Sequence, residues 1–343
     1  MSERHIRRRW GWTSDAVYEE AAPNLSRRRL EAALLARATG AIMRLDERVR
    51  ASSPAVRAGW MARALLHEAS ASARLDDVFV EAHELLMMDQ EAPDGLASQD
   101  TQRAYQGLQL LRAVGWRHPN QLLTPRCLLA AARVRLRDRL DVSGYPEWLV
   151  SRRAEPGEIR EALEKALDPA DLAALRRLPP LVGAAGFLVL WHRSGAADLL
   201  GGIAGRALAG VWLRREAGGF RTFLPGAGFI GQAAAYRPAA GDPWIGAFLE
   251  AAVRAADWGL DQLAALQMAE RWLAEAVDLK RTRGHVPALL ALLVSSPAIS
   301  PRGVTETLGI APMSARRLLD RLQRQHAIRE ITGPNSFRLF SVL

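Results

Sequence analysis

The feature that most restricts the fold lies near the end of the chain, where two short helical patterns are separated by a tight turn. Ser300 and Pro301 provide an N-cap followed by a proline at the first helical position. The first pattern ends at Gly309, which supplies the left-handed residue that a short turn needs. The second pattern begins near Pro312 and reaches Gln325. This order predicts a helix-turn-helix.

The surrounding sequence extends this prediction on both sides. A short apolar helix is expected at 286–294, before the helix-turn-helix. The positions expected to face inward are Val304, Leu308, Ala315, Leu318, Leu319 and Leu322. After the last helix, β-rich runs at 328–331 and 337–340 flank a Gly-Pro-Asn turn and predict a hairpin. Residues 280–343 are therefore predicted to form a winged helix-turn-helix with a small β-hairpin wing.

Positive charge is concentrated in the same segment. The chain has a formal net charge of +9, and residues 280–343 carry ten basic side chains against three acidic ones. The basic residues are Lys280, Arg281, Arg283, Arg302, Arg316, Arg317, Arg321, Arg324, Arg329 and Arg338. A GC-rich genome explains part of the arginine content, since the chain has only two lysines, but it does not predict this clustering. The clustering favours a polyanionic partner such as double-stranded DNA.

The predicted recognition helix leaves polar and basic residues off its buried face, where they would meet base edges and phosphates. The predicted DNA-binding residues are Ser300, Arg302, Thr305, Met313, Ser314, Arg316, Arg317, Arg321, Arg324, Asn335 and Arg338. Two alternatives stay open. In the first, the module serves only for protein interaction or dimerisation. In the second, a given arginine contacts a phosphate or stays solvated and does not read a base.

The rest of the chain predicts an all-α protein, because apolar residues recur near helical spacing from Asn24 onward. We expect a helical amino-terminal region at 1–66 and a helical core at 67–279, with an internal linker at 142–158. The stretch 181–215 is apolar and rich in Gly and Ala, which predicts two closely packed helices.

Several functional classes are excluded by what the sequence lacks. Cys127 is the only cysteine, so an intrachain disulfide and a cysteine-based zinc site are impossible. The histidines show no paired ligand spacing, and phosphate-binding and nucleophile-elbow motifs are absent, so we expect neither a metal nor a cofactor. Apolar runs are too short to span a membrane. The Arg7–Trp10 arm is either a groove-binding arm or a solvated tail. The expected location is the cytoplasm, with the nucleoid.

Three stretches resemble the Fic family, whose active members transfer AMP from ATP to protein hydroxyls. They are Glu68–Asp77, Gly205–Leu213 and Trp244–Leu249, which are similar to the amino-terminal signature, the end of the catalytic motif and a downstream tryptophan helix. The upstream run Arg44–Val49, with Val56–Trp60, resembles a divergent, largely rhizobial group of helix-turn-helix proteins of unassigned function. The resemblance implies a Fic-like helical core.

The catalytic motif of that family, H-P-F-x-[DE]-G-N-G-R-x-x-R, is degenerate in this chain. With Arg206 at its last arginine, Gly195 takes the place of the histidine base and Leu199 that of the acidic metal ligand. Gly201 and Ile203 replace the asparagine and the phosphate-binding arginine. The glycine cluster Gly201, Gly202 and Gly205 is expected to serve helix packing, although it would also allow close approach of a phosphate. The resemblance therefore implies a protein that is not an enzyme.

Ser72 and Asp76 keep the spacing of an inhibitory motif that restrains ATP binding in active relatives. Because there is no active site to restrain, we expect them to pack or cap a helix. The function expected from the whole sequence is DNA binding for transcriptional or mobile-element control, with a homodimer formed through the helical core. The alternatives are an inactive scaffold that binds a protein or a nucleotide, and an enzyme with rebuilt chemistry.

Overall fold

The fold was obtained as a computed structural model, which describes residues 25–90, 98–116, 123, 156–218, 223–239, 241–276, 284–332 and 338–343. The prediction of a mostly helical protein is confirmed. The amino-terminal helices are α3 (Leu25–Ala51), α4 (Pro54–Leu75), α5 (Ala82–Asp89) and α6 (Gln99–Trp116). The central helices are α9 (Pro156–Ala166), α10 (Pro169–Leu175), α11 (Pro180–Arg193), α12 (Ala196–Leu200) and α13 (Gly202–Ala217).

Two short 3-10 turns, η2 (Ala227–Phe229) and η3 (Ala233–Ala235), precede the long helix α14 (Asp242–Ala276). The last elements are α15 (Val286–Ser295), α16 (Pro301–Leu308), α17 (Pro312–Arg324), β1 (Arg329–Glu330) and β2 (Phe340–Ser341). The Arg7–Trp10 arm, Cys127, Asn335 and most of the expected linker at 142–158 lie outside the described residues. Among the described residues, no helix combines the length and apolar character that crossing a membrane requires.

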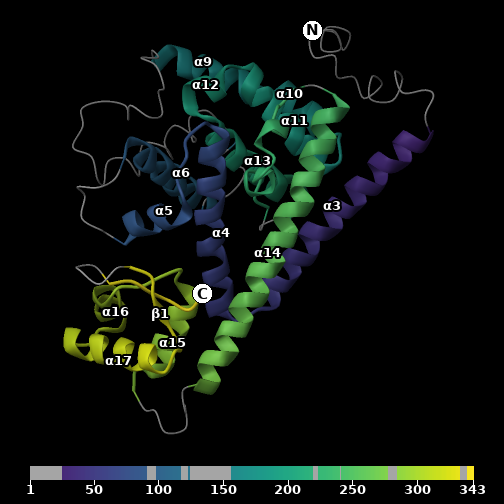
Figure 1. Ribbon diagram of the computed structural model, residues 1–343. Helices are drawn as coiled ribbons and strands as arrows, with labels where there is room; N and C mark the ends of the chain where they lie inside the picture. Colours follow the sequence, from purple (N-terminus) through teal and green to yellow (C-terminus); the bar gives the residue numbers. More distant parts are fainter. Residues whose placement is uncertain are drawn as a thin grey trace.

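The long helices α3, α4 and α14 lie side by side, and the other helices pack around them (Figure 1). Leu45 of α3 packs so closely on Gly259 of α14 that a Cβ there would come within 2.6 Å of it. Trp60 of α4 is buried and donates from Nε1 to the carbonyl oxygen of Gly259 over 2.8 Å. A small residue at 259 therefore lets three helices meet at one point.

Helices α11 and α13 pack closely, as the Gly- and Ala-rich stretch predicts, but the short helix α12 lies between them in the sequence and was not predicted. Gly205 faces Trp191, whose ring a Cβ would approach within 2.5 Å. Phe187 and Trp212 are fully buried beside this contact, with ring centroids 6.3 Å apart. The absence of side chains at the helix crossing thus makes room for large aromatic rings around it.

The carboxy-terminal elements follow the predicted order of three helices and a hairpin. Ser300 caps α16 by accepting the amide N–H of Gly303 over 3.0 Å, and Gly309 ends that helix with φ of 64°. β1 pairs antiparallel with β2, and Phe340 also forms an antiparallel bridge with Ile299. The segment just before α16 is therefore joined to the hairpin, a pairing that the sequence analysis did not predict.

Some helix boundaries differ from the sequence expectation. Residues 54–75 form the single helix α4, and the separate helix α5 begins at Ala82. The chain turns at Asp77, which has a positive φ of 58°. The expected domain boundary between residues 66 and 67 falls inside α4. Helices α9 and α10 are separate because Asp168 caps a new helix that begins with Pro169.

Candidate nucleic-acid interface and a buried polar cluster

Helix α17 has one apolar face, which it buries. Ala315, Leu319 and Leu322 are buried, and Leu318 is half-buried against the same core. This face packs against α16, so the opposite face of the helix is directed outward. Pro312 begins the helix at a position where the missing amide N–H costs nothing.

The outward face of α17 carries the predicted recognition residues. Met313, Ser314, Arg316, Arg317, Arg321 and Arg324 are all exposed. Because an α-helix turns by about 100° per residue, Met313, Arg317 and Arg324 fall within about 40° of one another. Arg324 donates to the carbonyl oxygen of Asp320, whereas Arg316, Arg317 and Arg321 form no ion pair with the part of the chain that the structure describes. The outward face therefore gathers four arginines; the one acidic residue of α17, Asp320, lies on the same face and is paired with Arg338.

Three other predicted contact residues belong to α16. Ser300 is buried and its hydroxyl is used for capping, so it holds the helix in place. Thr305 donates its hydroxyl to the carbonyl oxygen of Pro301 over 3.0 Å. Arg302 is exposed and pairs with Glu306 one turn later over 2.7 Å. Only Arg302 presents a charged group to solvent, and that charge is matched within the helix.

Arg338 lies in an intramolecular network that includes Asp320 of α17. Its guanidinium pairs with Asp320 over 3.0 Å and with Glu330 over 3.1 Å, and it donates to Gln323. It also lies over the ring of Phe340, 4.8 Å from the centroid. The hydrogen bonds that Arg338 donates to Glu330 and Asp320 hold its pKa above the ordinary value. This side chain therefore fastens the hairpin to α17.

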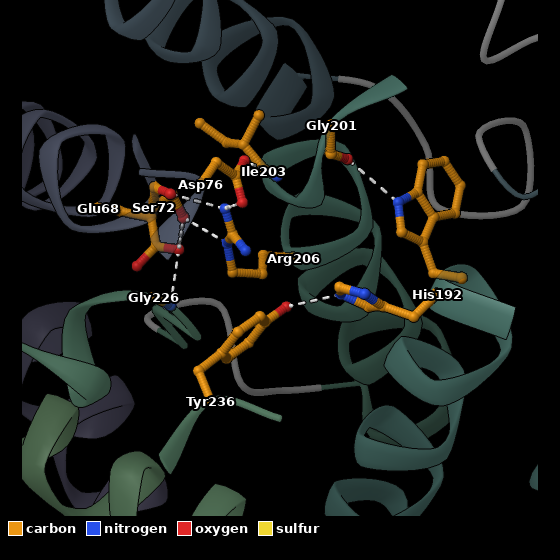
Figure 2. A network of polar contacts seen from close by, with 10 residues as sticks. Glu68, Ser72, Asp76, His192, Gly201, Ile203, Arg206, Gly226 and Tyr236 are labelled. Atoms are coloured by element: carbon orange, nitrogen blue, oxygen red, sulfur yellow. Dashed lines mark hydrogen bonds and ion pairs between the residues drawn. The ribbon is translucent and has the colours of Figure 1, made fainter. Parts of the chain in front are cut away.

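A second set of polar groups lies buried in the core, around Arg206 of α13 (Figure 2). The Arg206 side chain is fully buried. Its Nε donates to the hydroxyl of Ser72 over 2.9 Å, and its Nη2 donates to the carbonyl oxygen of Ser72 and to Asp76. Burial disfavours the charged guanidinium, but Tyr236 and Asp76 outweigh this effect and raise the pKa of Arg206. Arg206 therefore joins α13 to α4.

Glu68 continues this cluster along α4. Its two carboxylate oxygens accept the amide N–H groups of Gly226 and Ala227, each over 2.8 Å, and Ser72 donates to it over 3.0 Å. Burial raises the pKa of Glu68, and the two backbone hydrogen bonds oppose that rise. A Cβ at Gly226 would come within 2.5 Å of the Ser72 hydroxyl, so the loop before η2 fits closely over the cluster.

Tyr236 and His192 complete the cluster on the other side of Arg206. The Tyr236 hydroxyl lies 3.4 Å from Nε2 of His192, and the Arg206 guanidinium lies 5.1 Å from the Tyr236 ring centroid. Burial raises the pKa of Tyr236. Burial and the neighbouring Arg206 lower the pKa of His192, against smaller opposing effects of Asp76 and Asp198. The cluster therefore joins side chains from α4, α11, α13 and the loop before α14.

The residues aligned to the degenerate catalytic motif form helix ends and pack in the core. Gly195 and Gly201 have positive φ values of 80° and 79° at the two ends of α12, and Leu199 is half-buried. The amide N–H of Ile203, at the start of α13, is accepted by Asp76 over 3.1 Å. Asp76 thus caps α13, which is one of the two roles that the sequence analysis expected for it.

The space beside Arg206 is filled by the chain itself. Its Nη1 atom is buried and has no hydrogen-bond partner among the described residues. A Cβ at Gly202 would come within 2.6 Å of that atom and 2.4 Å of Asp76. The described residues also contain no group of three or more His, Cys, Asp or Glu side chains that could hold a metal ion.

The sequence analysis gave no role to Glu68, His192 or Tyr236 in a common site. Glu68 lies in the stretch that resembles the Fic family, and an acidic residue followed by alternating Ala and Ser is the sequence signal that could have found it. Tyr236 lies in the loop between η3 and α14, and no sequence pattern around it indicates a functional role. It joins the cluster only through contacts between α11, α13 and the loop after η3, which are distant in sequence.

Comparison with known proteins finds similarity to one protein family and to one rhizobial protein. The family described as "Protein of unknown function (DUF1403)" matches residues 224–342, which include α14 to β2. The chain is also similar to the "Uncharacterized protein y4cF" of Sinorhizobium fredii (strain NBRC 101917 / NGR234), with 32% identity over 89 residues. That similarity covers 26% of this chain and 22% of the other protein. The chain is therefore similar to a rhizobial protein and to a family whose functions are not described.

Proposed function

We propose that this chain is a DNA-binding protein whose residues 280–343 form a winged helix-turn-helix with α17 as its recognition helix. A role as a transcriptional or mobile-element regulator follows from this proposal. Support comes from the order of α15, α16, α17 and the β1–β2 hairpin, and from the turn at Gly309. The bridge between Ile299 and Phe340 adds the third strand-like segment that joins the hairpin to the helices.

The observation that carries the proposal is the arginine stripe on α17. Arg316, Arg317 and Arg321 are exposed and form no ion pair with the described residues, while the acidic side chains nearby are engaged by Arg302 and Arg338. Unpaired cations on one helix face match the phosphates that line a DNA groove. The major groove is about 12 Å wide and admits an α-helix. Arginines on such a helix reach phosphates on either side of the groove.

The helical core is proposed as a Fic-like scaffold without catalytic function. Arg206, which the resemblance places at the last arginine of the motif, is fully buried and bound to Ser72 and Asp76. In this arrangement it cannot reach a nucleotide. Incubation of the protein with labelled ATP and protein acceptors is therefore expected to transfer no label, and transferred label would favour the enzyme alternative.

Binding of the full chain to a labelled random-sequence duplex at low salt tests the proposal. The variant with Arg316→Ala and Arg317→Ala should lose affinity by at least about tenfold, because two phosphate contacts are removed. The matched control has Arg160→Ala and Arg177→Ala, which remove the same charge from exposed sites elsewhere. Undetectable binding by the unmodified chain, or equal affinities for the two variants, would reject the proposal.

The homodimer expected through the helical core is supported by two apolar side chains on α14. Met268 and Trp272 lie one turn apart and are 63% and 43% exposed. A second copy of the chain is the partner that the DNA proposal requires, because one winged helix contacts too few base pairs for high selectivity. Sedimentation of the unmodified chain should show a dimer, and the variant with Met268→Arg and Trp272→Arg should sediment as a monomer.

A further inference from the structure

We infer that Met313 is a specificity-determining residue that contacts the 5-methyl group of thymine in the major groove. The inference rests on the proposed DNA binding and goes further by naming the base that α17 selects. Packing does not explain why Met313 is exposed. Its side chain is 58% exposed, whereas the alanine and leucine side chains of the same helix pack inward.

The position of Met313 on α17 places it at the front of the outward face. It is the second residue of the helix and lies opposite the buried face that Ala315 and Leu319 form. Arg317 follows one turn later on the same side. The residues near the start of a recognition helix are those that contact base edges in helix-turn-helix complexes. Met313 is therefore in place to reach a base.

The chemistry of methionine limits what it can recognise. Its thioether is at best a weak acceptor and has no donor, so it cannot form the hydrogen bonds that distinguish guanine, adenine or cytosine. The one apolar group that base pairs present in the major groove is the methyl group on C5 of thymine. Contact between this methyl group and the Met313 side chain removes both from water. The unbranched side chain adapts its shape to such a contact.

Replacement of thymine by uracil tests the inference, because it removes the methyl group and changes no hydrogen-bonding group. A duplex is first selected by the full chain from a random-sequence pool and is then resynthesised with uracil at one thymine at a time. At one or two positions the unmodified chain should lose affinity by about fourfold, the effect of exposing one buried methyl group. At those positions Met313→Ala should bind the thymine and uracil duplexes equally, whereas Met313→Leu should keep a preference for thymine.

The possible outcomes distinguish failure of this inference from failure of the DNA-binding proposal. If the unmodified chain binds duplex DNA but tolerates uracil at every position, the assignment of Met313 is wrong and the DNA-binding proposal stands. If Met313→Ala remains as sensitive to uracil as the unmodified chain, another residue contacts the methyl group and the inference fails. If no duplex is bound at low salt, both fail together. Met313 is exposed, so its substitution is expected to leave the fold intact, and thermal unfolding of each variant checks this.

Discussion

Arg63 of α4 donates a hydrogen bond from Nη1 to the carbonyl oxygen of Val294, near the end of α15, over 3.2 Å. Its Nη2 donates to the carbonyl oxygen of Ser296 over 3.0 Å. Burial lowers the pKa of Arg63 to about 10, so the guanidinium remains charged at neutral pH. It satisfies carbonyl groups that a helix end leaves without partners. This contact fastens the carboxy-terminal elements to the long helices of the core.

Replacement of Arg63 by methionine should lower the free energy of unfolding by about 1–3 kcal/mol, because buried carbonyl groups lose their donor. Urea unfolding of the full chain measures this, and amide exchange should rise in 286–295. The control is Arg57→Met, one turn and a half earlier on α4 and exposed, for which a change below about 0.5 kcal/mol is expected. Equal effects of the two substitutions would show that the Arg63 contact does not hold α15.

Gly59 allows α4 and α15 to approach each other closely at the place where Arg63 joins them. A Cβ at this position would lie 2.0 Å from the carbonyl oxygen of Val294, so α15 would have to move away. Gly59→Ala should therefore destabilise the protein by about 1–3 kcal/mol. Gly40 of α3 has nothing within 4 Å of its added Cβ, and Gly40→Ala should stabilise the helix by about 0.5–1 kcal/mol. Thermal unfolding that shifts in the same direction for both variants would contradict this account.

Arg206→Met should be strongly destabilising, by about 3–5 kcal/mol, because it leaves Asp76 and Glu68 without their buried cation. The comparison is Arg176→Met, which breaks an exposed pair with Glu216 and should cost less than about 1 kcal/mol. If Arg206→Met does not fold, Asp76→Asn provides a milder change, since Asp76 is partly exposed and the amide oxygen still accepts the Ile203 N–H. If Arg206→Met lowers the free energy of unfolding no more than Arg176→Met does, the cluster does not stabilise the fold.

His67 gives the protein a pH dependence. Its ring stacks on Trp258 with centroids 3.9 Å apart, and burial lowers its pKa to about 4. The unfolded chain therefore takes up a proton near pH 6.5 while the folded chain does not. The His67 contribution to stability is complete above pH 6.5 and decreases as the pH falls toward 4. The free energy of unfolding in urea should differ less between pH 7.5 and pH 5 for His67→Phe than for the unmodified chain. An equal difference in the two proteins would refute the assignment to His67.

The local signals of the sequence predicted much of the carboxy-terminal region. Ser300 is an N-cap and Gly309 a left-handed helix end, as their residue types predicted, because both roles depend on a few neighbouring residues. The buried face of α17 also followed from spacing alone. The bridge between Ile299 and Phe340 was missed because a single pair leaves no alternating pattern in the sequence.

The contacts of the candidate sites were less predictable where they join distant segments. Arg338 belongs to a basic cluster in the sequence, yet its partners Asp320 and Glu330 become neighbours only when the hairpin packs on α17. Tyr236 reaches Arg206 through the loop after η3, and nothing in the residues around it indicates that approach. Spacing along the chain identifies the face of a helix, but it does not identify the segment that this face meets.

The salt dependence of DNA binding tests the central claim most directly. Each phosphate that a basic side chain neutralises adds about 0.9 to the magnitude of the slope of log K against log salt concentration. We expect a clear negative slope for the full chain on duplex DNA, and a slope smaller in magnitude by about 1.8 for the variant with Arg317→Ala and Arg321→Ala. The variant with Arg160→Ala and Arg177→Ala should keep the original slope. Equal slopes for all three proteins would contradict the claim that α17 is the DNA-binding face.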